Sequence, residues 1–151
     1  MAEQRQYEEL ARQLSAIGAV KRDLARVLPV DCPPGAAAVL VVLDKHGEMR
    51  IGRLAELLAI DMSVTSRHVA HGAERGWIDR SADPDDGRSR ILRLTRAGRA
   101  LIAELSDRYT QALADHLRDW SDDDVQRLSS LLARLRADFG DCRATTTRTP
   151  A

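Results

Sequence analysis

Aromatic residues and long apolar runs are scarce in this chain of 151 residues. Two tryptophans, two tyrosines and one phenylalanine make up 3% of it. Proteins that bind single-stranded nucleic acid stack bases on exposed rings, and five scattered rings form a poor platform for that role. No apolar run approaches the roughly 18 residues of a membrane-spanning helix, and the first residues lack the apolar stretch of a secretory signal. We therefore expect a cytoplasmic protein with no membrane partner.

Cysteine and lysine are also rare. Cys32 and Cys142 are too few for a disulfide framework, and without an export signal their thiols are expected to be reduced. Cys32 stands beside a predicted helix start, where a thiolate is favoured, so cysteine-based redox sensing is one alternative function. Lysine supplies only two of the 23 basic residues. Arginine suits bidentate contacts to phosphate or guanine, although a GC-rich genome would produce the same excess.

Sequence motifs of enzymes and metal sites are missing. The chain contains no G-x-S-x-G, P-loop or G-x-G-x-x-G pattern, and its four histidines and two cysteines lack zinc-ligand spacing. An aspartate-rich segment, residues 83–86, reads as a turn, and turn chemistry explains it. The sequence therefore predicts no catalytic residue, no cofactor and no metal site.

The charge of the chain is balanced overall but not locally. Basic and acidic residues number 23 each, so the net charge is zero, whereas a protein that holds nucleic acid by bulk charge would be basic. Residues 50–99 contain ten arginines and seven acidic residues, a local charge of +3. Any contact with DNA is therefore expected within this segment. The length of the chain predicts a single domain, residues 1–151.

Hydrophobic periodicity predicts a mainly α-helical fold with a small β-hairpin. Helices are expected over 7–28, 36–45, 51–59 and 63–75, with Asp31 as a cap of the second and Gly76 as the stop of the fourth. Strands are expected over 77–80 and 89–94, joined by a turn rich in Asp, Pro and Gly. Two long helices close the chain, capped by Thr95 and Ser121. Residues 141–151 have no apolar period and are expected to be flexible.

A tight helix pair followed by a hairpin is the outline of a winged helix-turn-helix. Residues 83–95 match the wing pattern D-x-R-x-x-x-x-x-L-T of the MarR (multiple antibiotic resistance regulator) family, with Asp86, Arg88, Leu94 and Thr95 in register. The segment 64–69, followed by Gly76 and Arg80, is similar to the recognition-helix region of that family. The order of elements also fits over about residues 5–140.

The resemblance implies a transcriptional regulator that binds double-stranded DNA and is therefore nucleoid-associated. It predicts a winged helix-turn-helix lobe over about 36–95 and dimerisation helices over 5–30 and 96–140, with the interface formed by 7–28 and 113–139. It further implies a homodimer, most simply a repressor, on a pseudo-palindromic operator. Two alternatives stay open beside redox sensing: an adaptor of the same fold that has lost DNA binding, and an enzyme, for which the sequence offers no polar cluster.

The helix over 63–75 is the expected recognition helix. Helical spacing turns Thr65, His68, Val69 and Gly72 toward the core and leaves the predicted DNA-binding residues outside: Ser63, Ser66, Arg67 and His71. The family pattern has a large apolar residue, usually Leu, at position 72. Glycine costs about 1 kcal/mol in a helix interior and removes a core anchor, and this departure motivates the adaptor alternative.

The hairpin is the expected wing. Asp86 is placed to hold its tip by pairing with the Arg88 guanidinium or with amides of the loop. Arg88 is predicted to enter a narrow minor groove, where the negative potential is concentrated, and Arg90 to contact phosphate or support the tip. Leu94 is expected to anchor the strand in the core.

A small effector is expected to release the DNA. The mostly apolar helix over 36–45 should meet the dimerisation helices, and such junctions favour preformed pockets. We predict that Leu40, Leu43 and His46, with Ile17 opposite, line a site for a small apolar or aromatic, anionic ligand. The alternative is a filled core without a cavity.

Overall fold

The computed structural model describes residues 3–139 as six helices and three short strands. The helices are α1 Gln4–Ala25, α2 Pro34–His46, α3 Ile51–Leu58, α4 Met62–Glu74, α5 Arg96–His116 and α6 Asp122–Asp138. The strands are β1 Met49–Arg50, β2 Ile78–Ala82 and β3 Arg90–Leu94. The predicted mainly helical fold with a small hairpin is confirmed. The tail predicted to be flexible, residues 141–151, and Cys142 lie outside the described residues.

Local sequence features explain where the helices begin and end. Thr95 Oγ1 accepts a hydrogen bond from the Gly98 amide, and Ser121 Oγ accepts one from the Asp124 amide, each at 3.1 Å. Both predicted caps are therefore confirmed. Gly76 follows the end of α4 and has a φ of +78°, a backbone conformation that favours glycine. The prediction that Asp31 caps α2 is wrong, because Pro33 is the N-cap residue and α2 starts at Pro34.

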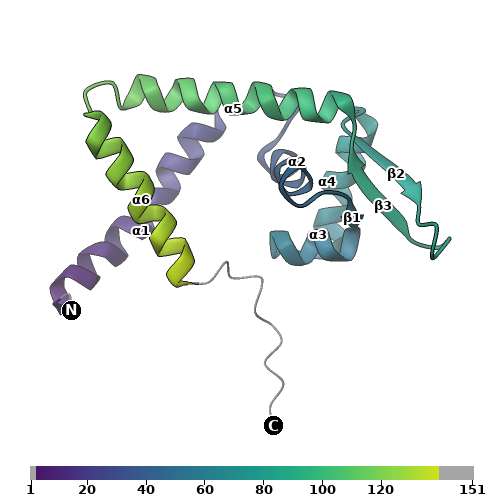
Figure 1. Ribbon diagram of the computed structural model, residues 1–151, viewed down its shortest axis with the longest axis horizontal. Coiled ribbons are helices and arrows are strands. Elements are labelled where there is room, and N and C mark those ends of the chain that lie inside the picture. Colours follow the sequence, from purple (N-terminus) through teal and green to yellow (C-terminus); the bar gives the residue numbers. More distant parts are fainter. Residues whose placement is uncertain (1–2, 140–151) are drawn as a thin grey trace, which may run out of the picture.

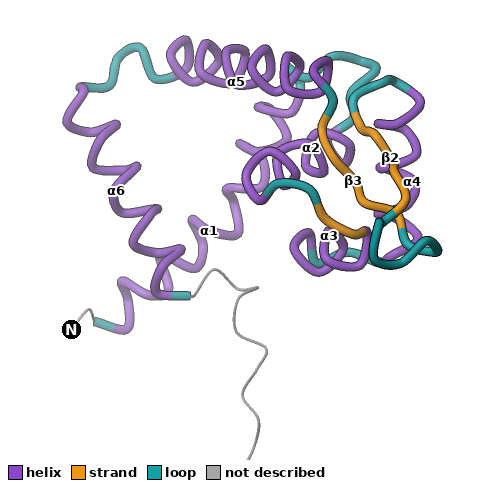
Figure 2. Tube along the Cα trace, turned by 45° about the vertical axis from the view of Figure 1, so that its right-hand side comes forward, coloured by secondary structure: helices purple, strands orange, loops and turns teal. Residues whose placement is uncertain are grey.

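The three strands form one antiparallel sheet in the order β1-β3-β2. The hairpin pairs Ile78 with Leu94 at its base and Ala82 with Arg90 near its tip. The third strand, β1, precedes α3 and pairs with β3 through Met49 and Leu92. Figure 2 shows the hairpin projecting beside α3 and α4.

The residues from α2 to the first half of α5, 34–105, form what we call the core lobe. Leu40, Leu54, Val69 and Leu92 are at most 2% exposed and belong to one hydrophobic cluster of this lobe. Helices α2, α3 and α4 contact one another, and α4 also contacts β2. The core lobe thus fixes α4 and the hairpin in one packed unit.

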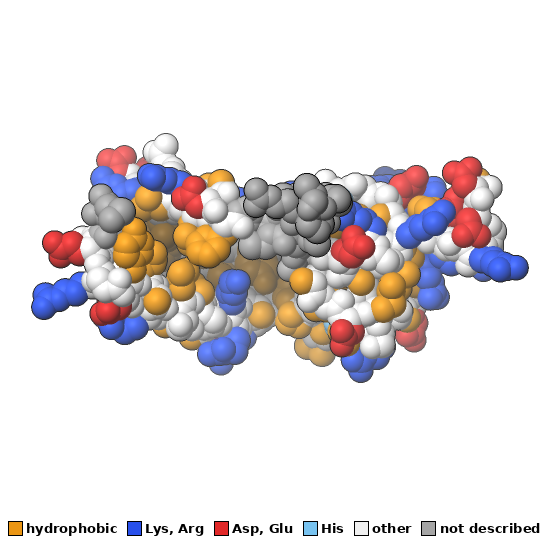
Figure 3. Space-filling model, turned by 90° about the horizontal axis from the view of Figure 1, so that it is seen from below, with side chains coloured by type: hydrophobic (Ala, Val, Ile, Leu, Met, Phe, Trp, Pro, Cys, Tyr) orange, Lys and Arg blue, Asp and Glu red, His pale blue; other side chains and the backbone are white. Residues whose placement is uncertain are grey.

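The helices α1 and α6, with the second half of α5, form what we call the arm. Figure 1 shows α5 running from the core lobe to α6, while α1 and α6 cross on the far side. Over their described ranges, neither α1 nor α6 contains a buried residue. Figure 3 shows hydrophobic side chains gathered over the arm. No helix of the described chain is both long and apolar enough to cross a membrane.

Candidate nucleic-acid interface

Helix α4 buries one face and exposes the other as its sequence predicts. Thr65, Val69 and Gly72 are buried, and His68 is half-buried. Ser63, Ser66 and Arg67 are exposed on the opposite side. The predicted division of the helix is confirmed for these residues, and contact between the exposed set and DNA stays a prediction.

His71 does not belong to the exposed face, and its predicted outward orientation is wrong. Its Nε2 lies 2.7 Å from the backbone oxygen of Asp31, in the segment between α1 and α2. Its ring also meets the Trp77 ring edge-on, with the centroids 5.8 Å apart. The sequence could not show this because Asp31 is 40 residues away along the chain.

The glycine at position 72 is compensated by a neighbouring strand. A Cβ atom at Gly72 would lie 2.6 Å from Ile78 Cδ1, so the side chain of Ile78 occupies the space that a larger residue would need. Ile78 is 4% exposed and belongs to the core cluster. The concern that glycine leaves the recognition helix without an anchor is therefore answered by packing between α4 and β2.

The tip of the hairpin is held by Asp86 through the loop rather than through a guanidinium. Its Oδ1 accepts a hydrogen bond from the Arg88 amide at 3.1 Å, and its Oδ2 accepts one from Ser89 Oγ at 3.0 Å. Asp86 was predicted to hold the tip through either the Arg88 guanidinium or amides of the loop, and the structure shows the bond to a loop amide. The Arg88 side chain is consequently left exposed at the tip.

A second carboxylate, Asp83, anchors the loop of the hairpin just after β2 ends, and it was missed by sequence reasoning. Asp83 is 6% exposed, and its Oδ2 accepts a hydrogen bond from Arg50 Nε of β1 at 2.8 Å. Its Oδ1 accepts one from the Asp85 amide at 2.9 Å. The bond from the Asp85 amide and the pairing with Arg50 hold the pKa of Asp83 below its usual range. The turn chemistry was visible in the sequence, but the partner 33 residues away was not.

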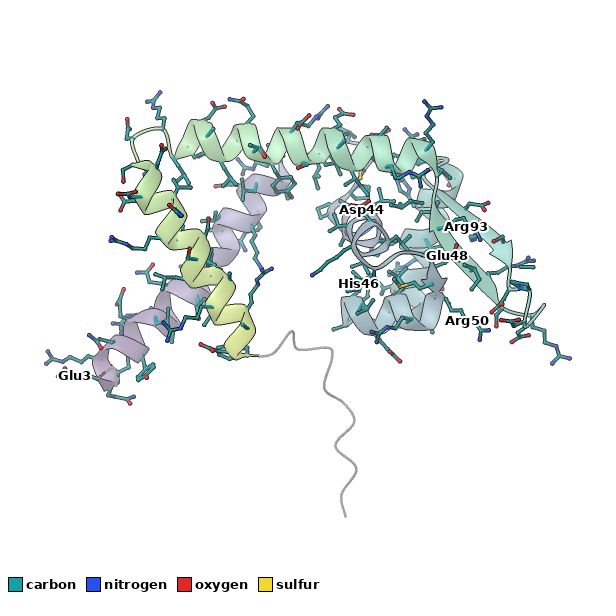
Figure 4. All side chains as sticks on the ribbon, viewed as in Figure 1. Glu3, Asp44, His46, Glu48, Arg50 and Arg93 are labelled. Carbon is teal, nitrogen blue, oxygen red and sulfur yellow. The ribbon has the colours of Figure 1, made fainter. Side chains whose placement is uncertain are left out.

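The arginines around this surface fall into two groups. Among the described residues, Arg50 is paired with Asp83, Arg53 with Glu56 and Arg93 with Glu48. Figure 4 labels Arg50, Glu48 and Arg93 at this end of the core lobe. A second group is exposed and has no ion pair within the described chain: Arg67, Arg80, Arg88 and Arg90.

A cleft separates the helix pair from the hairpin. It has a volume of about 660 Å³, and its walls include Ser66 of α4 together with Arg80, Arg88 and Arg90 of the hairpin. Free guanidinium groups of this kind match phosphate oxygens and guanine edges, because the planar fork donates two parallel hydrogen bonds. Arg80 was not among the predicted site residues, although it belongs to the sequence pattern around Gly76.

The predicted effector residues do not line one cavity. Leu40 and Leu43 are 0% and 3% exposed and belong to the core, whereas Ile17 is 45% exposed on α1. His46 is exposed at the end of α2, where Figure 4 labels it. A cavity of about 570 Å³ does lie between α2 and α5, but a different face of α2 lines it: Ala37, Ala38, Val41 and Val42.

Cys32 lacks the surroundings of a reactive cysteine. It is 0% exposed, and burial, assisted by the neighbouring Asp31 carboxylate, raises the pKa of its thiol. A redox-sensing cysteine needs the opposite, a lowered pKa and access for the oxidant. The expected thiolate at the helix start is therefore wrong.

The fold and the surface together define a winged helix-turn-helix protein. Helix α4 corresponds to the recognition helix and the β2–β3 hairpin to the wing, both carrying exposed arginines. The chain belongs to the MarR family of transcriptional regulators. The family model described as MarR family matches residues 30–89.

Relatives and solved structures agree with this membership. YxaD of Bacillus subtilis strain 168, an HTH-type transcriptional regulator, is 30% identical over 99 residues, 66% of this chain and 69% of the relative. A probable transcriptional regulator from Pseudomonas aeruginosa is 31% identical, with a TM-score of 0.64 over 80% of this chain and 93% of that one. A mutant MarR from E. coli, solved with operator DNA, shares the fold with a TM-score of 0.65 and 21% identity, over 89% and 99% of the two chains. The family comprises regulators and not enzymes.

Proposed function

We propose that this protein is a homodimeric repressor that places one α4 helix and one wing on each half of a pseudo-palindromic operator. The observation that carries the proposal is the set of arginines without an ion pair in the described chain, on the exposed side of α4 and in the walls of the neighbouring cleft. Arg67 projects from the exposed side of α4, while Arg80, Arg88 and Arg90 line the cleft beside it. The solved operator complex of a neighbour with the same fold supports a DNA partner of this kind.

The exposed groups have distinct proposed roles. Arg67 suits guanine in the major groove because its fork matches the two acceptors of that base. Arg88, at the tip of the wing, suits a narrow minor groove. Ser63 and Ser66, at the first turns of α4, suit phosphates or base edges, and Arg90 suits phosphate.

The proposed dimer follows from the uncovered apolar surface of the arm. Tyr7, Leu10 and Leu14 of α1 are 40–51% exposed, and Leu128 and Leu132 of α6 are 40% and 46% exposed. Monomeric proteins rarely leave apolar stripes of this length in water. A second copy presenting the same stripes would cover them around a two-fold axis.

Release by a small effector is proposed at the cavity between α2 and α5. Its volume of about 570 Å³ lies within the usual range of about 300–1,000 Å³ for ligand pockets. Its walls are apolar except for the hydroxyl groups of Ser106 and Tyr109, and no charged residue lines it. A neutral aromatic or apolar molecule therefore fits better than the anionic one first expected. By packing against α5, it would change the position of the core lobe relative to the arm.

Selection of bound duplexes from random double-stranded DNA tests the proposal directly. The expected product is a pseudo-palindrome with half-sites about one helical turn, roughly 10–10.5 bp, apart or a multiple of it. Arg67→Ala should relax the preference at one position of each half-site. Absence of any enriched sequence at low salt would favour the adaptor alternative, and a uniform loss of affinity in Arg67→Ala would mean phosphate contact.

A thermal-shift screen tests the effector. Neutral phenols should raise the melting temperature and displace the operator more effectively than salicylate-like acids, and Ala38→Phe, which fills the cavity, should abolish both effects. If neither class of compound stabilises the protein at millimolar concentration, release by a small ligand at this cavity is wrong.

A further inference from the structure

The recognition helix is held from behind by the linker between α1 and α2, residues 26–33. His68, His71 and Arg75 are three and four residues apart, so they share one face of α4. This face lies about half a helical turn from Ser66, which lines the cleft. All three side chains meet the linker or the first turn of α2.

The first contact is an ion pair. The guanidinium of Arg75 pairs with the carboxylate of Asp31, and both side chains are about half-exposed. The Cζ atom of Arg75 also lies 5.7 Å from the centroid of the Trp77 ring. Because Trp77 is 8% exposed within the core cluster, the cation–π contact holds the guanidinium in the direction of the linker.

The second contact uses the backbone of the same linker residue. His71 Nε2 lies 2.7 Å from the Asp31 carbonyl oxygen. A carbonyl oxygen only accepts, so Nε2 carries the hydrogen and donates it. The edge-on contact with Trp77, at 5.8 Å between centroids, fixes the plane of the imidazole.

The third contact is a close approach of two helices. The His68 ring covers Gly35 in the first turn of α2, and a Cβ atom at Gly35 would overlap that ring. Glycine at this position therefore lets α4 lie against the start of α2. Together the three contacts join the rear face of α4 to the linker and to the first turn of α2.

The other side of the linker is tied to the helix that leads into the arm. Arg108 of α5 donates from Nη1 to the Val27 carbonyl oxygen at 3.1 Å. Its Nη2 is paired with Glu104 of the same helix at 2.6 Å, which orients the guanidinium. The linker thus connects α4, which faces the proposed DNA, to α5, which continues into the arm.

We infer that Asp31, His71 and Arg75 are positioning residues that set the half-site separation accepted by the dimer. The inference rests on the proposed function, since it assumes one α4 helix on each half-site. One base pair inserted between half-sites rotates them by about 34–36° and moves them by about 3.4 Å. Two α4 helices that are held by the linker cannot adjust to this rotation and shift of the half-sites. Two α4 helices without the linker contacts can adjust to it.

The test compares affinities for operators of different half-site separation. The duplex selected from random DNA is used unchanged, with one base pair inserted, and with one removed between the half-sites. Wild-type protein should bind both altered duplexes about tenfold or more weakly than the unchanged duplex. For Asp31→Ala and Gly35→Ala, the loss of affinity should be less than about threefold. Asp23→Ala is the matched control. Within residues 3–139, this exposed aspartate of α1 forms an ion pair with Arg26 alone, at 3.5 Å, so the variant should behave as wild type.

A charge-exchanged double variant, Asp31→Arg with Arg75→Asp, separates pairing from general damage. It should recover most of the discrimination that Asp31→Ala loses. If Asp31→Ala discriminates among the three duplexes as strongly as wild type, the positioning role is overturned. If wild-type protein itself does not discriminate, the proposed two-fold binding to the operator is wrong, and the inference falls with it.

A distance measurement without DNA tests the inference even if a variant binds the operator too weakly for its affinity to be compared. Spin labels on Ala70→Cys, in a Cys142→Ser background, report the distance between the two α4 helices of a dimer. The distribution should be narrow in the otherwise wild-type protein and clearly broader with Asp31→Ala. Equal widths in folded protein, as judged by circular dichroism, would overturn the inference.

Discussion

The core lobe and the arm differ in how much of their apolar surface the chain itself covers. In the core lobe, Leu54 and Leu92 are at most 1% exposed, whereas in the arm Leu128 and Leu131 are 40% and 55% exposed. All four belong to regular apolar patterns, so periodicity does not distinguish a leucine buried within the chain from one left for a partner. The comparison teaches that the core lobe has its own hydrophobic core, while the apolar residues of α1 and α6 in the arm stay uncovered by the described chain.

The largest expected effect comes from opening a void in the core lobe. Leu54→Ala should lower the free energy of unfolding by about 2–5 kcal/mol, because it removes buried methyl groups and leaves a cavity. Urea denaturation at a fixed protein concentration measures the change, and operator binding should fall with it. A loss below about 1 kcal/mol would mean that the lobe collapses around the void and is less rigid than its packing indicates.

The next effect comes from a charge in the arm, which should disrupt the proposed dimer and leave the core lobe folded. Leu128→Glu places a charge in the apolar stripe of α6 and should shift the protein from dimer to monomer in sedimentation equilibrium at micromolar concentration. Ser130→Glu, exposed on the other side of the same helix, is the matched control and should remain dimeric. A monomeric wild-type protein would show that the arm is covered in some other way.

A smaller effect distinguishes free from paired arginines on the hairpin. Arg88→Ala should weaken operator binding by about 1–3 kcal/mol with an unchanged circular dichroism spectrum. Arg93→Ala is the control, since Arg93 is already paired with Glu48 at 3.2 Å and should change affinity little. Equal affinity of Arg88→Ala and wild type would remove Arg88 from the interface.

The smallest effect concerns Asp83, which anchors the loop of the wing just after β2 ends. Because the pKa of Asp83 is lowered in the folded protein, its carboxylate stabilises the fold above the ordinary aspartate pKa of about 4. This stabilisation is lost as the pH falls through the lowered value. The difference in melting temperature between wild type and Asp83→Asn should therefore be largest near neutral pH and shrink below about pH 4. A difference in melting temperature that stays the same between about pH 3 and pH 7 would contradict this role of Asp83.

Sequence reasoning predicted the helices, the hairpin and most of the exposed face of α4. These features depend on local patterns: a three-to-four residue apolar period, a capping hydroxyl such as that of Thr95, and turn residues within a short segment. It failed at His71 and Asp31, which belong to different segments. It also misplaced the cavity, because α2 is apolar nearly all round and its pattern does not indicate which side faces α5.

The sequence by itself thus determined the winged helix-turn-helix outline and the candidate residues Ser63, Ser66, Arg67, Arg88 and Arg90, since each follows from spacing along a helix or hairpin. Only the tertiary structure decided which groups meet across long stretches of chain. Ile78 fills the space beside Gly72, and Arg50 reaches Asp83. The physical reason is that helix periods and turns are set by neighbouring residues, whereas packing partners are set by how separate elements come together. The contacts of His71 and Arg75 with Asp31, on one face of α4, result from that packing. So does the exposure, on the opposite side, of the arginines without an ion pair in the described chain.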